Sequence, residues 1–162
     1  QKEELEDDKC KGMVDIMSER IYIISMLQDL IFVNMEKECL LNSDEIIQKI
    51  YNRFIQRNDK SVIDRIGIHT LKSELHSKKA FYFGLILFEL LVHIKELLKN
   101  DTLYSADMRY SHEEEYICNT VSLNHKNGAI SKTENDILNI LVKNSSGIIK
   151  YENNLIRIKI PI

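Results

Sequence analysis

The side chains that could perform acid–base, nucleophilic or metal chemistry are few and scattered. Histidine, the side chain best suited to proton or phosphoryl transfer near neutral pH, occurs as His69, His76, His93, His112 and His125. No two of them form an HxxxH or HExxH pair, so the sequence predicts no metal site built on a helix. The cysteines are Cys10, Cys39 and Cys118, without a CxxC motif. We therefore expect reduced thiols, a cytoplasmic location and no disulfide framework.

Two ionisable groups interrupt the longest apolar segment, FYFGLILFELLVHI. Glu89 and His93 lie four residues apart there, so a helix would place them on one side. Glu89 is either a catalytic base or a hydrogen-bonded or partly solvated acid of a pocket. His93 is either a ligand or acceptor, or a buried group that lines a pocket. For Arg53 and Arg57, docking of an acidic partner and a solvated helix face both remain open.

Length and composition limit the classes of function. The chain has 162 residues, of which 44% are hydrophobic and 29% are charged, which fits one domain or one domain with a helical extension. Lys and Arg number 22 against 25 Asp and Glu, a formal net charge of -3, so broad binding to nucleic acid is not expected. Because Glu89 and His93 interrupt the apolar segment, no membrane-spanning helix is predicted either.

The hydrophobic pattern changes period along the chain. Residues 11–33 have helical spacing with a wide apolar stripe, in which Ile16, Ile23 and Leu30 recur every seven residues. Further helices are predicted from Asn42 to a break at 57–59, over 77–99, and over 133–143. Strands are predicted at 66–68, 104–110 and 117–123 and in a final hairpin over 147–162. This order predicts an α+β sandwich preceded by a helical hairpin.

Three segments resemble one family of signalling proteins. VDIMSERIYIISMLQDL (14–30) resembles the first hairpin helix of the histidine phosphotransferases of the bacterial cell-cycle phosphorelay. KKAFYFGLILFELLVHIKELL (78–98) is similar to the helix that carries the magnesium ligands in kinase ATP domains, and residues 145–162 resemble the closing hairpin of that domain. The resemblance implies a helical dimerisation hairpin at 1–58 and a degenerate histidine kinase-type (GHKL or Bergerat) α/β sandwich at 59–162.

The chain departs from the family at its reactive positions. The phosphoacceptor histidine falls at Val14, which has no nucleophilic nitrogen, although the neighbouring Asp15 is retained. In the second motif Glu89 is retained, but the magnesium-binding Asn falls at His93, a poor magnesium ligand. The adenine-reading turn falls at 126–130 and keeps only Gly128. Glu89, His93 and Gly128 are therefore relics of a nucleotide pocket, and no cofactor or metal is expected.

The resemblance implies a homodimer that docks the receiver domain of a response regulator. Its dimer or partner surface would consist of Met13, Met17, Arg20, Ile24, Leu27 and Ile31. Phosphotransferase activity stays open because the acceptor is missing, and ATP-dependent kinase activity is not expected. Two alternatives remain: a non-catalytic dimeric scaffold with other partners, and an active kinase core with a divergent pocket.

Overall fold

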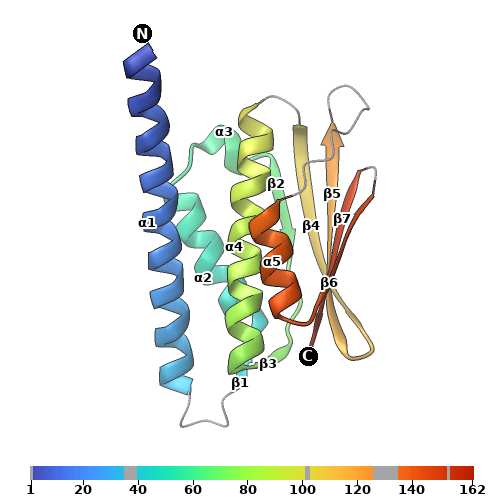
Figure 1. Ribbon diagram of the computed structural model, residues 1–162. Helices are drawn as coiled ribbons and strands as arrows, with labels where there is room; N and C mark the ends of the chain where they lie inside the picture. The colour runs from blue at the N-terminus through green and yellow to red at the C-terminus, as the bar shows by residue number, and fades with distance from the viewer. Residues whose placement is uncertain (1, 35–39, 101–102, 126–134, 153) are drawn as a thin grey trace.

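The computed structural model describes residues 2–34, 40–100, 103–125, 135–152 and 154–162, with side chains from Cys10 onward except that of His125. Its elements follow the chain as α1 (Lys2–Asn34), β1 (Leu40–Asn42), α2 (Ser43–Gln56), α3 (Lys60–Ile63), β2 (Ile66–His69), β3 (Glu74–His76), α4 (Ser77–Lys99), β4 (Leu103–Glu113), β5 (Tyr116–His125), α5 (Asp136–Asn144), β6 (Ile148–Glu152) and β7 (Leu155–Pro161). Figure 1 shows the helices gathered on one side of the sheet. The predicted α+β class is confirmed.

The main sheet has five strands in the order β2-β4-β5-β7-β6. β2 runs parallel to β4, and the other neighbours are antiparallel, so the sheet is mainly antiparallel as predicted. Successive side chains of a strand point to opposite faces of the sheet, so every second one faces the helices. In β7 these are Ile156, Ile158 and Ile160, which are buried. Arg157 on the same strand is exposed.

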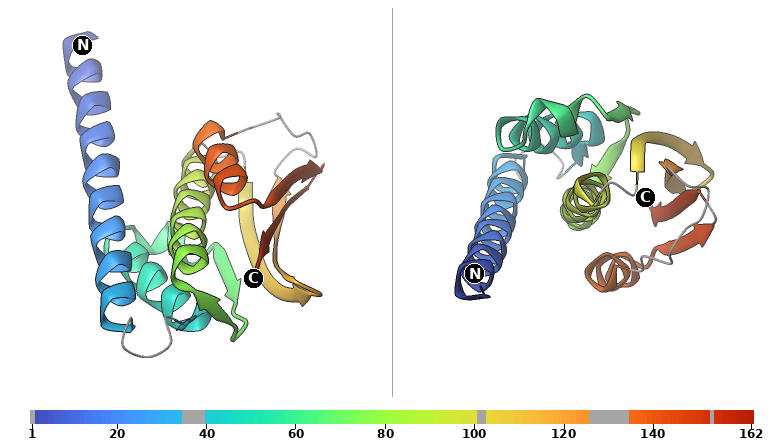
Figure 2. Two further views of the ribbon diagram at one scale, coloured as in Figure 1. Left: turned by 60° about the horizontal axis from the view of Figure 1, so that its bottom comes forward. Right: turned by 90° about the horizontal axis from the view of Figure 1, so that it is seen from above.

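α4 lies at the centre of the molecule, between α1 and α2 on one side and the sheet on the other (Figure 2). This position explains why the helix is apolar nearly all round, since almost every side must meet another element. It begins and ends at the predicted residues, Ser77 and Lys99. Phe83, Leu90 and Ile94 are almost fully buried and join one hydrophobic cluster that reaches from α1 to β7.

Two short elements that the sequence analysis does not predict attach α2 to the rest of the fold. β1 pairs antiparallel with β3, which leads directly into α4. The Ser43 hydroxyl donates to the Leu71 carbonyl (2.6 Å) and accepts from the Ser73 amide (2.9 Å). The Asn42 side chain caps α2, as predicted, by accepting from the Asp44 amide (2.9 Å). The β1–β3 pairing and the two Ser43 hydrogen bonds cross the boundary at 58/59, and that division into domains stays a prediction.

The last helix begins later than predicted. α5 starts at Asp136, and the side chain of Asn135 caps it by accepting from the Leu138 amide (3.0 Å). Thr133 lies outside the described residues. In the described part of the chain, no helix has the length and apolar content needed to cross a membrane.

Candidate functional site

α1 presents one apolar face to the rest of the chain. Ile23 and Leu27 are at most 1% exposed, and Leu30 is 9% exposed. The helices approach closely at Gly84 of α4, where an added Cβ would lie 2.6 Å from Cδ2 of Leu27. A glycine here leaves the space that Leu27 fills, so the contact fixes how α1 packs on α4.

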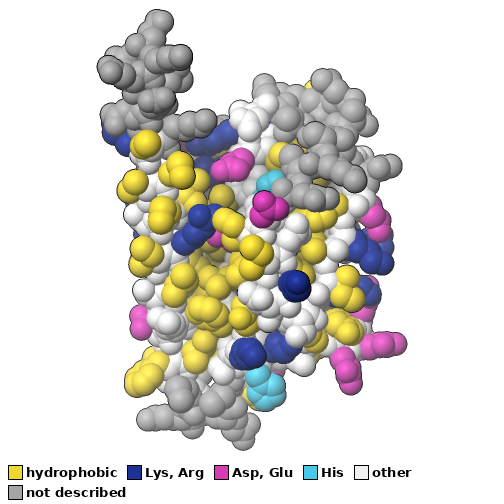
Figure 3. All heavy atoms as spheres, viewed as in Figure 1, with side chains coloured by type: hydrophobic (Ala, Val, Ile, Leu, Met, Phe, Trp, Pro, Cys, Tyr) yellow, Lys and Arg dark blue, Asp and Glu magenta, His cyan; other side chains and the backbone are white. Residues whose placement is uncertain are grey.

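A second apolar face of α1 has no partner among the described residues. Met13, Val14, Met17, Ile21 and Ile24 expose 63, 61, 58, 65 and 36% of their surfaces. In Figure 3, hydrophobic side chains line α1 and continue over the surface towards α4. Exposed apolar side chains gathered on one face are typical of an interaction surface, whereas single ones are ordinary.

The structure divides the predicted partner surface between these two faces. Met13, Met17 and Ile24 lie on the exposed face, and Ile31 is half-buried against the core. Leu27 is not available to a partner, because it is packed against Gly84. Arg20 is turned towards α4 as well. The seven-residue spacing could not separate these faces, because both have apolar side chains at helical intervals.

Arg20 and Glu89 form the ion pair that joins α1 to α4. The Arg20 Nε and Nη2 atoms donate to the two carboxylate oxygens of Glu89, at 2.6 and 2.8 Å. The Glu89 side chain is 5% exposed and that of Arg20 is 31% exposed. The hydrogen bonds to Glu89 raise the pKa of Arg20. The Glu89 carboxylate is therefore hydrogen-bonded and occupied by a cation from another helix.

A second charged cluster joins α1 to α2. The Arg53 Nε and Nη2 atoms donate to the Glu19 carboxylate at 2.9 and 2.8 Å, and Arg57 Nε donates at 2.8 Å. The guanidinium of Arg53 also lies 4.0 Å from the centre of the Tyr22 ring. Burial favours a higher pKa for Glu19, but the hydrogen bonds and charges of both arginines outweigh it, so the pKa is lowered. These residues face each other within the chain, a contact that sequence spacing does not reveal.

His93 is buried without a hydrogen bond to its Nε2 atom. The residue is 7% exposed, and the described part of the chain offers Nε2 no partner. Burial lowers the pKa of His93 against a smaller opposing effect of Glu96, so the neutral ring is favoured. Gly128, the third predicted pocket residue, lies outside the described residues. Within the described ranges there is no group of three or more His, Cys, Asp or Glu side chains that could hold a metal.

The predicted phosphoacceptor position lies on the outer surface of α1. Val14 is 61% exposed and belongs to the unpartnered apolar face. Asp15 is exposed too, but it borders a cavity between α1, α2 and α4. A side chain at position 14 is thus accessible to another protein, whereas one at position 89 is not.

Known proteins match this chain by structure and not by sequence. No protein-family model matches, and neither does any curated protein sequence. The histidine kinase domain of the blue-light activated histidine kinase EL346 from Erythrobacter litoralis superposes with a TM-score of 0.67 at 13% identity, covering 93% of this chain and 81% of that chain. A longer form of that kinase gives a TM-score of 0.59 at 15% identity, covering 95% and 60%.

A second kinase gives the same result. The histidine kinase AdeS of Acinetobacter baumannii superposes with a TM-score of 0.56 at 12% identity, covering 95% of this chain and 82% of that chain. These similarities extend over α1 as well as the sheet, since they leave at most a few per cent of the chain uncovered. The chain therefore shares the α+β fold of histidine kinase domains.

Proposed function

We propose that this chain is a signalling module of two-component type that resembles a histidine phosphotransferase, forms a homodimer through α1 and docks a response-regulator receiver domain. The observation that carries the proposal is the apolar face of α1 that has no partner among the described residues and that includes position 14. The histidine kinase-like fold supports the same assignment. We also propose, as the sequence predicts, that the protein is located in the cytoplasm.

The spacing on α1 favours a second copy of the chain as a partner. Val14, Met17, Ile21 and Ile24 follow one another at intervals of three, four and three residues, which is the spacing of a coiled-coil seam. Two copies can pair such a seam with itself across a two-fold axis. Pairing would remove from water apolar side chains that the monomer exposes, at about 25 cal/mol per Å².

Self-association is tested by sedimentation with Met17→Glu, which places a charge in the seam. We expect the wild type to be dimeric and Met17→Glu to weaken the dimer at least about tenfold, roughly 1.4 kcal/mol. Val33→Glu is the matched control, because Val33 is 68% exposed on α1 but lies outside the seam. A wild type that stays monomeric at all concentrations would remove the dimer.

The proposed chemistry concerns a receiver, not ATP. Val14 cannot take a phosphoryl group, so the natural chain would dock a receiver without accepting phosphate at that position. Loss of ATP binding is supported by Phe88, which is 5% exposed and stands where the kinase helix that this segment resembles has an Asn directly before its Glu. It is also supported by the occupied carboxylate of Glu89. Nucleotide titration gives a separate test, in which micromolar affinity for ATP would contradict a lost pocket.

The decisive experiment restores the missing acceptor. Val14→His is incubated with a phosphorylated receiver domain and magnesium. In the expected transfer the receiver's aspartyl P–O bond breaks, a P–N bond forms on the imidazole, and the aspartate carboxylate is released. Ile21→His is the matched control, because it is 65% exposed on the same face. Acid-labile label on Val14→His alone supports the proposal, and no binding and no label on any variant would remove it.

A non-catalytic dimeric scaffold is the second candidate. It is favoured by the absence of the acceptor at Val14 together with the ion-paired Glu89, since neither position offers a free reactive group. A dimer that binds no receiver domain in a titration would favour the scaffold over the signalling module.

A further inference from the structure

A cavity of about 380 Å³ lies between α1, α2 and α4. Its apolar wall comes from all three helices, namely Ile16 of α1, Phe54 of α2, and Phe88 and Val92 of α4. A volume of this size and an apolar wall with a few polar groups are typical of small-molecule sites. No one helix could form it, so the cavity exists only in the packed structure.

The charged groups at the cavity are not evenly balanced. Four basic side chains line it, Arg53, Arg57, Lys95 and Lys99, against the three acids Asp15, Glu19 and Glu96. Glu19 is already bonded to both arginines. Among the described side chains, no ion pair joins Lys95 or Lys99 to a carboxylate. One anionic group of a ligand would therefore balance the excess positive charge of the described lining side chains.

The two lysines also lie close enough to affect one another. Burial, followed by the charge of Lys99, lowers the pKa of Lys95 against the smaller opposing effects of Glu96, Asp15 and Asp59. An anion between the two ammonium groups would replace this repulsion by two charge-assisted hydrogen bonds. Phe88 and Val92, one turn apart on the same helix, would meet the apolar part of the same ligand.

We propose that this cavity binds a small amphipathic anion, with an apolar ring or chain against Ile16, Phe54 and Phe88 and one carboxylate or sulfonate group at Lys95 and Lys99. The site is independent of the proposed receiver docking. A bound ligand would touch α1, α2 and α4 at once, and it would stabilise the packing of α1 on the other two helices.

The test uses anilinonaphthalene sulfonate as the probe and phenylnaphthylamine, the same ring system without the sulfonate, as its uncharged counterpart. Binding is followed by fluorescence titration of the full chain. We expect Lys95→Gln/Lys99→Gln to weaken sulfonate binding about tenfold. The matched control is Lys143→Gln/Lys150→Gln, which removes two exposed lysines from α5 and β6, and should leave binding unchanged.

Location is measured separately by amide chemical shifts, because the outer face of α1 is also apolar. Shifts at residues 12–19, 53–58 and 88–99 together would support the cavity. Shifts confined to the outer face of α1, without α2, would overturn it. Equal affinity for the two probes, or sulfonate binding unaffected in the Lys95→Gln/Lys99→Gln variant, would overturn the assignment of an anion.

Discussion

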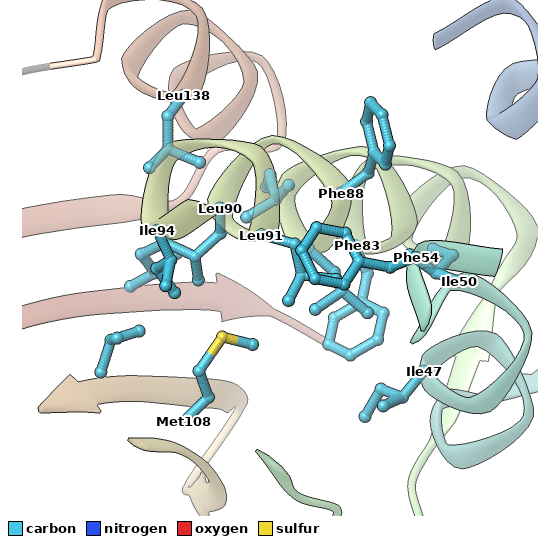
Figure 4. Packing of buried hydrophobic residues seen from close by; sticks show 14 of the residues in the cluster. Ile47, Ile50, Phe54, Phe83, Phe88, Leu90, Leu91, Ile94, Met108 and Leu138 are labelled. Carbon is cyan, nitrogen blue, oxygen red and sulfur yellow. The ribbon is translucent and has the colours of Figure 1, made fainter. Parts of the chain in front are cut away.

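The two sides of α4 are held by different kinds of interaction. Towards the sheet, Leu90, Leu91 and Ile94 pack against strands that include Met108 without an intervening charge (Figure 4). Phe88 points the opposite way in the same view. On the α1 side the contacts are apolar packing around Leu27, the Arg20–Glu89 ion pair and a cavity, and the Glu19 ion pairs join α1 to α2 beside them.

This difference indicates which helix contacts change in strength with pH and salt. Apolar packing changes little with pH or salt, whereas ion pairs depend on both, and partly buried ions must also lose water. The packing of the sheet on α4 should therefore contribute nearly the same stability at different pH values and salt concentrations. The attachment of α1 should vary with charge, and α1 is the helix that exposes the proposed partner surface.

The largest expected effect tests the sheet side. Leu90→Ala removes a side chain that is 0% exposed and should lower the free energy of unfolding by about 3 kcal/mol, because a cavity is left in the core. Val92→Ala, next to an existing cavity on the α1 side, should cost less. Urea denaturation measures both. Equal losses would contradict the distinction between the two sides.

Removal of Arg20 tests the ion pair on the α1 side. Arg20→Met leaves the Glu89 carboxylate buried without a cation and should cost about 3 kcal/mol, similar to or slightly less than Leu90→Ala. Arg20→Met/Glu89→Leu should recover most of this loss, because no unpaired charge remains. Urea denaturation of both variants measures these losses. A double variant as unstable as Arg20→Met would show that the ion pair itself stabilises the fold.

The close approach of α1 to α4 is tested at Gly84. Gly84→Ala should cost about 2 kcal/mol, because the new methyl group meets Leu27. Combined with Leu27→Ala, the loss should be smaller than the sum of the two single losses, by about 1 kcal/mol. Additive losses in thermal or urea unfolding would show that the cost of Gly84→Ala does not come from its contact with Leu27.

The Glu19 cluster should make stability fall in acid. The pKa of Glu19 in the folded state is lowered below the unfolded value of about 4.3. The contribution of Glu19 to stability is therefore present above that pH and is lost as the pH falls through the folded pKa. Glu19→Gln should be less stable than the wild type by about 1 kcal/mol at pH 7. This difference should shrink below about pH 4. A constant difference from pH 7 to pH 3 would argue against a charge effect.

His93 of α4 should give the smallest change in stability among these tests. Because its folded pKa lies below the unfolded value of about 6.5, unfolding takes up a proton, and stability falls as pH decreases through that value. Between pH 7.5 and 5.5 the loss should be less than about 1 kcal/mol. His93→Asn should remove this loss, and His112→Asn, at an exposed site, should keep it. The reverse pattern would contradict the assignment.

Periodicity and local signals predicted much of the fold. The bounds of α4, the cap of α2 at Asn42 and the final hairpin follow from residue type and near-neighbour spacing, and the structure confirms them. β1 and β3 have three residues each, too few for a period to be read. Their pairing depends on strands more than thirty residues apart, which no local pattern encodes.

For the candidate site, the sequence by itself determined that position 14 has no nucleophilic group, since valine lacks one in any fold. It also determined that α1 is apolar over a wide arc. Only the tertiary structure decided that Leu27 faces inward while Met17 faces outward, that Glu89 meets Arg20, and that three helices enclose a cavity. The physical reason is that helix periodicity orders side chains around one axis, whereas ion pairs and cavities depend on how several axes are placed.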